Sequence, residues 1–208
     1  MARASSFFGV ILAAGASSRM GRDKALLPWP PGAASGTVLS GAIEVLHRHS
    51  DLVVVVGGGN AAALEPVADS LSAYLVRNPQ PERGQFSSLQ VGLQEVLNRG
   101  RDAAIVALVD RPPATDAVVE RLRQAYLDSP REVWAVVPEH GGRHGHPVVF
   151  GREMITAFLR APVSSSAREV EHAHPQHILY LPVDDSLVVA NLDTPEDYER
   201  LAALSVKG

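Results

Sequence analysis

Short, continuous apolar runs alternate along this chain with longer stretches in which apolar residues recur every three or four positions. The runs are rich in Val, Ile and Leu, as buried parallel strands are, and predict strands at residues 7–12, 53–57, 73–78, 103–110, 134–138, 146–150, 178–183 and 186–191. The spaced patterns predict helices at residues 37–49, 87–100, 117–127, 152–159 and 194–204. Such alternation predicts an α/β fold: a three-layer, doubly wound, mostly parallel sheet in a single domain spanning residues 1–208.

Composition narrows the functional classes. With 208 residues, of which 46% are hydrophobic and 20% charged, the chain can bury a core without disulfides or structural metal. Its formal net charge of −4 argues against nucleic acid or an anionic membrane as a partner. The absence of cysteine excludes thiolate catalysis and Cys-ligated zinc, and is typical of a cytoplasmic protein. No apolar run reaches the roughly 18 residues that indicate a membrane span.

A loop of small residues follows the first predicted strand and leads into a basic segment. Residues 12–29 read LAAGASSRMGRDKALLPW. Ala, Gly and Ser leave backbone N–H groups accessible, so an anion can approach them closely, and Arg19, Arg22 and Lys24 follow. The segment lacks both the GKS/GKT ending of a Walker loop and the GxGxxG dinucleotide pattern. It predicts another kind of phosphate loop, with a surface turn carrying scattered basic residues as the alternative.

Two aspartates come at or just after the ends of predicted strands. Asp110 closes the strand at 103–110, and Asp193 follows the strand at 186–191. If both strands lie parallel to the first, these carboxylates leave the edge of the sheet that the basic loop leaves. Magnesium typically takes one or two protein carboxylates and completes its shell with water and phosphate oxygens. Each aspartate alone also fits a turn or a helix cap, but together with the basic loop they predict a magnesium site.

The segment LAAGASSRMGRDKALLP resembles the LAAGxSxRMGxxKxLLP opening of the MobA-like nucleotidyltransferases, and within them the cytidylyltransferase branch that acts on the molybdenum cofactor. GQFSSLQVGL, LVDRPP, GHPVVF and PVDDSLVVANLDTPEDYERL resemble further segments of that family in the same order. The resemblance therefore extends over essentially the whole chain. It implies a Rossmann-like, GT-A-like nucleotidyltransferase that uses Mg²⁺ and releases pyrophosphate.

The resemblance also implies roles for the matched positions. The nucleotide would contact Leu12, Ala13, Ala14, Gly15, Arg19, Lys24, Gln85, Ser87, Ser88 and Asp110. Arg19, Lys24 and Asp110 would be the catalytic groups, with Asp110 and either Asn191 or Asp193 on the metal. His146, Pro147 and Arg168 would lie on the acceptor side. For Ser87 and Ser88, capping of the helix before Leu89 is an equal alternative.

In this family LAAG accompanies cytidine and LAGG guanosine, so Ala14 indicates CTP as the donor. The implied partners are CTP or another nucleoside triphosphate and a phosphorylated acceptor of molybdopterin type, with a molybdoenzyme or maturation protein as a candidate recipient. The chain departs from the family pattern at Arg111, Ser166 and Asn191. Two alternatives therefore stay open: a sugar-phosphate or methylerythritol-phosphate acceptor, and a non-catalytic nucleotide-binding module that loads cofactor onto a partner.

Overall fold

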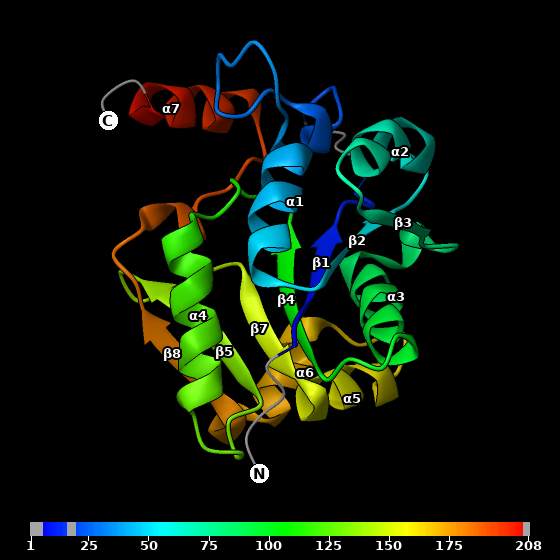
Figure 1. Ribbon diagram of the computed structural model, residues 1–208, viewed down its shortest axis with the longest axis vertical. Coiled ribbons are helices and arrows are strands. Elements are labelled where there is room, and N and C mark those ends of the chain that lie inside the picture. Colours follow the sequence, from blue (N-terminus) through cyan, green and yellow to red (C-terminus); the bar gives the residue numbers. More distant parts are fainter. Residues whose placement is uncertain (1–5, 16–19, 206–208) are drawn as a thin grey trace.

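The computed structural model of the protein describes residues 6–15 and 20–205. Within that part of the chain, eight strands form one sheet with helices on both faces (Figure 1). The strands are β1 (Phe8–Leu12), β2 (Leu52–Gly57), β3 (Tyr74–Arg77), β4 (Ala103–Leu108), β5 (Ala135–His140), β6 (Arg143–His144), β7 (Val148–Gly151) and β8 (Ile178–Pro182). The α-helices are α1 (Val38–His49), α2 (Ala61–Ser70), α3 (Gln85–Asn98), α4 (Asp116–Asp128), α5 (Arg152–Arg160), α6 (Ala167–Ala173) and α7 (Pro195–Ser205).

The sheet confirms the predicted doubly wound, mostly parallel architecture. Its order is β3-β2-β1-β4-β7-β5-β6, with β8 also paired to β5. β1 is parallel to both β2 and β4, whereas β7 is antiparallel to its neighbours β4 and β5. The chain builds outward from β1 to β3 and then crosses back to β4 on the other side of β1. The carboxyl ends of β1 and β4 therefore meet where the strand order reverses, which is where ligands bind in such sheets.

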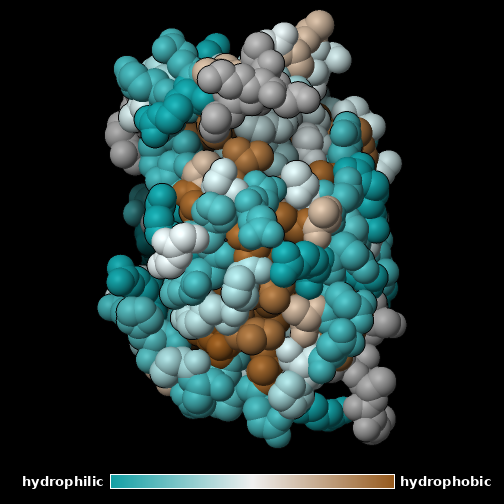
Figure 2. All heavy atoms as spheres, turned by 90° about the vertical axis from the view of Figure 1, so that its left-hand side faces the viewer, coloured by the Kyte–Doolittle hydropathy of each residue, from teal (hydrophilic) through white to brown (hydrophobic). Residues whose placement is uncertain are grey.

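Alternating side chains of the first strand separate two hydrophobic cores. Phe7 and Ile11 belong to the core that includes α1 and α4, whereas Val10 and Leu12 belong to the core that includes α3 and α5. Burial on both faces explains why β1 reads as a continuous apolar run. On the face of the molecule that lies to the left in Figure 1, hydrophilic side chains cover most of the surface and hydrophobic ones show between them (Figure 2).

One predicted strand is wrong. Within residues 186–191 the chain forms a short 3₁₀ helix, η4 (Ser186–Val189), instead of a strand. The Asp185 carboxylate accepts a hydrogen bond from the Leu187 backbone N–H at 2.9 Å and so starts this helix. Val188 and Val189 are buried, and a short apolar run of this kind does not distinguish a strand from a buried helical turn. Helices α2 and α6 were not expected from the pattern. No helix in the described residues has the length and apolar character needed to cross a membrane.

Candidate active site

Backbone hydrogen bonds join three segments where β1 ends. The Ala13 N–H donates to the Val56 carbonyl of β2 at 2.9 Å, and the Val109 N–H donates to the Leu12 carbonyl at 3.2 Å. Gly58, which follows β2, approaches the same loop so closely that an added Cβ would lie 2.8 Å from the Ala14 carbonyl oxygen. Ala14 is half-buried and Gly15 exposed. Arg19 lies outside the described residues.

Asn60 holds this loop from the end of the neighbouring strand. Its side-chain amide donates to the Ala13 carbonyl at 2.9 Å and to the Asp23 carboxylate at 2.6 Å, and its side-chain oxygen accepts the Gly58 N–H at 3.1 Å. The other carboxylate oxygen of Asp23 caps the 3₁₀ helix η1 (Lys24–Leu26) through the Ala25 N–H. Sequence reasoning missed Asn60, although the run GGGN directly after a predicted strand placed it at the ligand-binding edge of the sheet.

The predicted phosphate-binding lysine contacts a predicted metal ligand. Lys24 Nζ lies 2.7 Å from Asp193 Oδ1, and only 8% of Lys24 is exposed. Thr194 caps α7, because its hydroxyl accepts the Asp197 N–H, while the Asp197 carboxylate accepts the N–H groups of Asp193 and Thr194. The Asp193 carboxylate is therefore directed to Lys24 and not to the helix end.

Asp110 brings a second carboxylate to the same place. Its backbone carbonyl accepts the Leu192 N–H at 2.8 Å, which ties the end of the β4 segment to the chain just before Asp193. Burial raises the pKa of the Asp110 carboxyl, while Arg111 and Lys24 act to lower it and Asp193 to raise it. Oδ1 of Asp110 is buried with no hydrogen-bond partner among the described residues.

These two carboxylates fit a magnesium ion, which needs only one or two. No group of three or more His, Cys, Asp or Glu side chains in the part of the chain that the structure describes is arranged to hold a metal. Asn191, the other predicted ligand, is exposed. Nearby, Arg111 donates to the Ala190 carbonyl at 3.3 Å and Arg143 to the Val189 carbonyl at 3.2 Å, so two cations hold the segment that carries the second carboxylate.

The two predicted serines are buried near the start of α3. Asn78 donates to the Ser87 hydroxyl at 2.8 Å and to the Ser88 hydroxyl at 2.9 Å. Neither serine is the helix cap, because Gly84 occupies that position with φ +88°. Ser88 still lines the site described next, whereas Ser87 does not.

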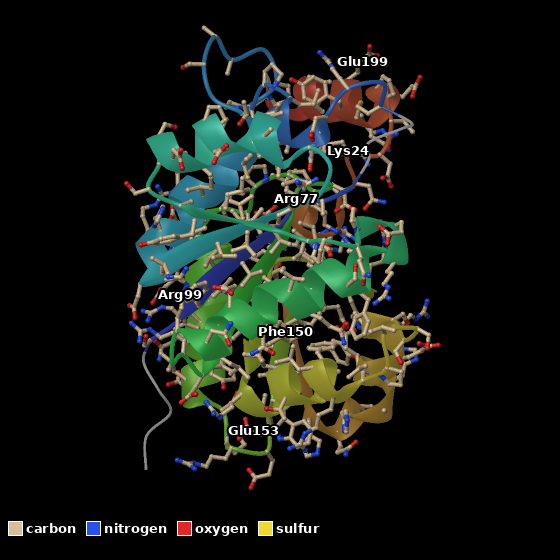
Figure 3. The ribbon with its side chains drawn as sticks, turned by 90° about the vertical axis from the view of Figure 1, so that its right-hand side faces the viewer. Lys24, Arg77, Arg99, Phe150, Glu153 and Glu199 are labelled. Carbon is tan, nitrogen blue, oxygen red and sulfur yellow. The ribbon has the colours of Figure 1, made fainter. Side chains whose placement is uncertain are left out.

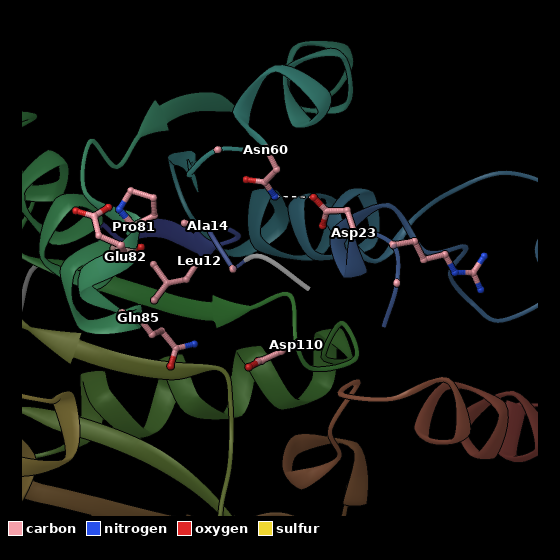
Figure 4. Close-up of a pocket in the computed structure, with 14 residues that line it drawn as sticks. Leu12, Ala14, Asp23, Asn60, Pro81, Glu82, Gln85 and Asp110 are labelled. Carbon is pink, nitrogen blue, oxygen red and sulfur yellow. Dashed lines mark hydrogen bonds between the residues drawn. The ribbon is translucent and has the colours of Figure 1, made fainter. Parts of the chain in front are cut away.

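A cavity of about 1080 Å³ lies over these segments, with Asp110 and Gln85 on one side and Asn60 and Asp23 on the other (Figure 4). Of the predicted nucleotide contacts, Leu12, Ala14, Gly15, Gln85, Ser88 and Asp110 line it. Arg22, a basic residue of the predicted phosphate loop, also lines it, as do Pro81 and Glu82, which were not predicted.

A second cavity, of about 480 Å³, shares Leu12, Gly84 and Gln85 with the first. It brings together His146 and Arg168, two of the three predicted acceptor-side residues. Pro147 instead lines a small pocket beside Arg111. His146 Nδ1 is buried without a partner among the described residues, and burial with the nearby Arg111 lowers the pKa of His146 to about 3.

Comparison with known proteins gives consistent matches. The MobA-like NTP transferase domain family matches residues 9–178. A probable molybdenum cofactor guanylyltransferase of Mycobacterium avium (strain 104) is 30% identical over 204 residues, covering 97% of this chain and 98% of that protein. The molybdenum cofactor cytidylyltransferase of Escherichia coli (strain K12) is 23% identical over 189 residues, covering 91% and 92%.

Among solved structures, Rv0371c of Mycobacterium tuberculosis H37Rv superposes with a TM-score of 0.80 at 27% identity, covering 97% of this chain and 99% of that one. Its complex with manganese has a TM-score of 0.75 at 24% identity, covering 95% and 98%.

Proposed function

The chain belongs to the MobA-like NTP transferase domain family, and on that premise we propose that it transfers a nucleoside monophosphate from a nucleoside triphosphate to the phosphate of a molybdopterin-type acceptor, releasing pyrophosphate. The observation that carries the proposal is the convergence of Lys24, Asp110 and Asp193 from three distant segments, with Asp110 lining the cavity of about 1080 Å³. A cation and two carboxylates in one cluster suit the binding of a polyphosphate and its metal ion, which is what phosphoryl and nucleotidyl transfer mainly require of the protein.

We propose Asp110 and Asp193 as the residues that hold a divalent cation, Mg²⁺, with the exposed Asn191 as a weaker amide ligand. The buried, unpartnered Oδ1 of Asp110 supports this assignment, and the manganese complex of Rv0371c supports the use of a divalent cation. When bound, the cation would neutralise phosphate charge that develops during transfer.

The chain's own side chains would position the reactants. Lys24 would exchange its contact with Asp193 for a phosphate oxygen, and Arg19 is proposed as the second phosphate-binding cation. The backbone of residues 12–15, held by Asn60, would bind the nucleoside, with Gln85 and Ser88 at its far side and Ser87 supporting them. The acceptor phosphate is already ionised at neutral pH, so it can attack the α-phosphorus in line without a general base.

CTP is the donor that we propose, because Ala14 stands in the loop as the cytidine-associated LAAG and because the E. coli relative is named a cytidylyltransferase. GTP is the second candidate, favoured by the guanylyltransferase name of the M. avium relative. The test is pyrophosphate release from each of the four nucleoside triphosphates with molybdopterin and Mg²⁺. We expect kcat/KM to be at least about tenfold higher for CTP than for GTP, which corresponds to about 1.4 kcal/mol.

A preference for GTP would change the assigned donor but would not contradict the proposed transfer reaction. Tight binding of a triphosphate without any pyrophosphate release would overturn the transfer reaction and favour a nucleotide-binding module that loads cofactor onto a partner.

A further inference from the structure

The second cavity adjoins the cavity of about 1080 Å³ in which we place the nucleotide, and it holds a carboxyl group that the proposed mechanism does not use. Glu171 of α6 lines this cavity together with an apolar floor that includes Phe86, Leu89, Val148 and Phe150. Figure 3 shows Phe150 below α3, on the far side of that helix from Lys24. Within the described residues no hydrogen bond or ion pair engages the Glu171 carboxylate. Glu171 is half-buried, so its carboxyl group loses part of its hydration without gaining a protein partner, and a ligand with N–H donors would restore what is lost.

The lining of the second cavity carries two arginines besides the Glu171 carboxyl group. Arg83 and Arg168 line it as cations, and both are exposed. Arg83 directly precedes Gly84, which belongs to the wall shared by the two cavities. An acceptor phosphate near that wall would therefore lie beside a cation and next to the nucleotide cavity, whereas Glu171 would repel the same phosphate. The acidic group must face a different part of the acceptor.

We propose that Glu171 is a specificity-determining residue of the acceptor site, whose carboxylate accepts two adjacent N–H groups from the edge of a flat heterocyclic acceptor. This inference rests on the proposed function, because it names the acceptor class of that same reaction. The apolar and aromatic floor fits the faces of a planar ring system. A carboxylate accepts paired N–H donors through its two oxygens, as it does from arginine. A sugar phosphate offers hydroxyl groups and no planar N–H edge, so the site disfavours it.

The test uses a phosphate-free probe, 6-hydroxymethylpterin, a planar bicycle with adjacent ring N–H and amino donors, titrated by fluorescence into the full-length protein. The variant is Glu171→Gln, which keeps the shape and replaces one acceptor oxygen with a donor. The matched control is Glu153→Gln, because Glu153 is an exposed carboxylate of α5 that lies away from Lys24 in Figure 3. Quinoxaline, a planar bicycle without N–H donors, measures stacking alone.

We expect the Kd of the pterin to rise at least about tenfold in Glu171→Gln and to stay unchanged in Glu153→Gln, with quinoxaline binding equal in all three proteins. CTP binding should be the same in all three. Equal pterin affinity in Glu171→Gln and wild type, or no pterin binding to wild type, would overturn the assignment. Pyrophosphate release by the wild type is measured separately, so a failure of the transfer reaction is told apart from a failure of Glu171.

The pH dependence supplies a readout that a merely structural role would not change. Burial raises the pKa of Glu171 to about 7, so the carboxylate form that accepts N–H donors is lost as the pH falls below that value. The pKa of His146, which lines the same cavity, is lowered to about 3, and that of Tyr180, which interacts electrostatically with Glu171, is raised above its ordinary value of 10.0, so neither group changes its charge between about pH 5.5 and 7.5. Pterin affinity should therefore weaken as the pH falls across this range in the wild type and stay flat in Glu171→Gln. A flat wild-type profile would contradict the proposal.

Discussion

Lys24 and Asp193 are 169 positions apart in the chain, yet the ammonium group of one lies 2.7 Å from the carboxylate of the other. The pair joins the segment after β1 to the segment before α7, so both reach the carboxyl edge of the central strands. Because Lys24 is nearly buried and Asp193 is partly buried, loss of either partner would leave the other charge incompletely solvated and unpaired, which is costly.

Lys24→Met is expected to reduce kcat/KM for the nucleoside triphosphate by about 10²–10³-fold, because it removes the charge that would meet the transferred phosphate. Pyrophosphate release at saturating acceptor measures the effect. Arg99→Met is the control, since it removes an exposed cation that follows α3 and lies away from Lys24 in Figure 3. A loss within threefold in Lys24→Met would contradict the phosphate role.

Asp110→Asn should lose activity and gain stability. Burial raises the pKa of Asp110 above its ordinary value of 3.8, so the folded state holds this proton more tightly than the unfolded state and loses stability as the pH rises past that value. At pH 7 a neutral asparagine avoids the cost of a buried anion. We expect Tm without ligands to rise by about 2–4 °C for each kcal/mol recovered, and pyrophosphate release to fall by about 100-fold or more.

Asp69→Asn on the exposed side of α2 is the control for this experiment and should change neither quantity. Undiminished turnover in Asp110→Asn would remove this residue from the metal site, whatever its Tm.

The regular elements of the fold were predictable because they are encoded locally. β1 and β4 are buried apolar runs, and α1 begins at a Thr37 cap and keeps helical spacing. The edge of the sheet was predictable for Asp110, which closely follows β4, and for Lys24, which belongs to the basic segment that continues the loop after β1. Asp193 reached that edge even though the strand expected before it is a 3₁₀ helix, because the Leu192 N–H binds the Asp110 carbonyl.

Asn60 and Glu171 could not be assigned from the sequence for the opposite reason. The role of Asn60 depends on Ala13 and Asp23, which lie 47 and 37 positions away. Glu171 matters because a short helix carries it to a cavity floored by β7 and α3. The position of Asn60 after β2 indicates the ligand-binding edge of the sheet, but its partners, like the cavity around Glu171, become visible only when distant segments pack together.

Asn60→Ala should weaken nucleotide binding with little change in kcat. The substitution removes the donors to the Ala13 carbonyl and the Asp23 carboxylate. More free energy would then be needed to hold the backbone of residues 12–15 in its bound conformation. A loss of about 1–2 kcal/mol corresponds to a 5- to 30-fold rise in the Kd for CTP, measured by calorimetry. Asn98→Ala, on the exposed end of α3, should bind CTP as the wild type does. A fall in kcat at unchanged Kd would instead assign Asn60 to the chemical step.

His146 and Glu171, which both line the second cavity, should change the stability of the fold with pH in opposite directions. His146 has a pKa lowered from 6.5 to about 3, so the unfolded state binds its proton more readily and stability is lost as the pH falls below about 6.5. Glu171 has a pKa raised from 4.5 to about 7, so stability is lost as the pH rises through that interval. In the wild type these effects oppose each other between about pH 4.5 and 6.5. Removing one group leaves the effect of the other unopposed. As the pH rises, the free energy of unfolding of His146→Gln should fall relative to the wild type, and that of Glu171→Gln should rise. Each difference should be at most about 1.4 kcal/mol per pH unit. Urea unfolding at several pH values measures both slopes, and variants that keep the wild-type slope would show that neither group changes its proton affinity on folding.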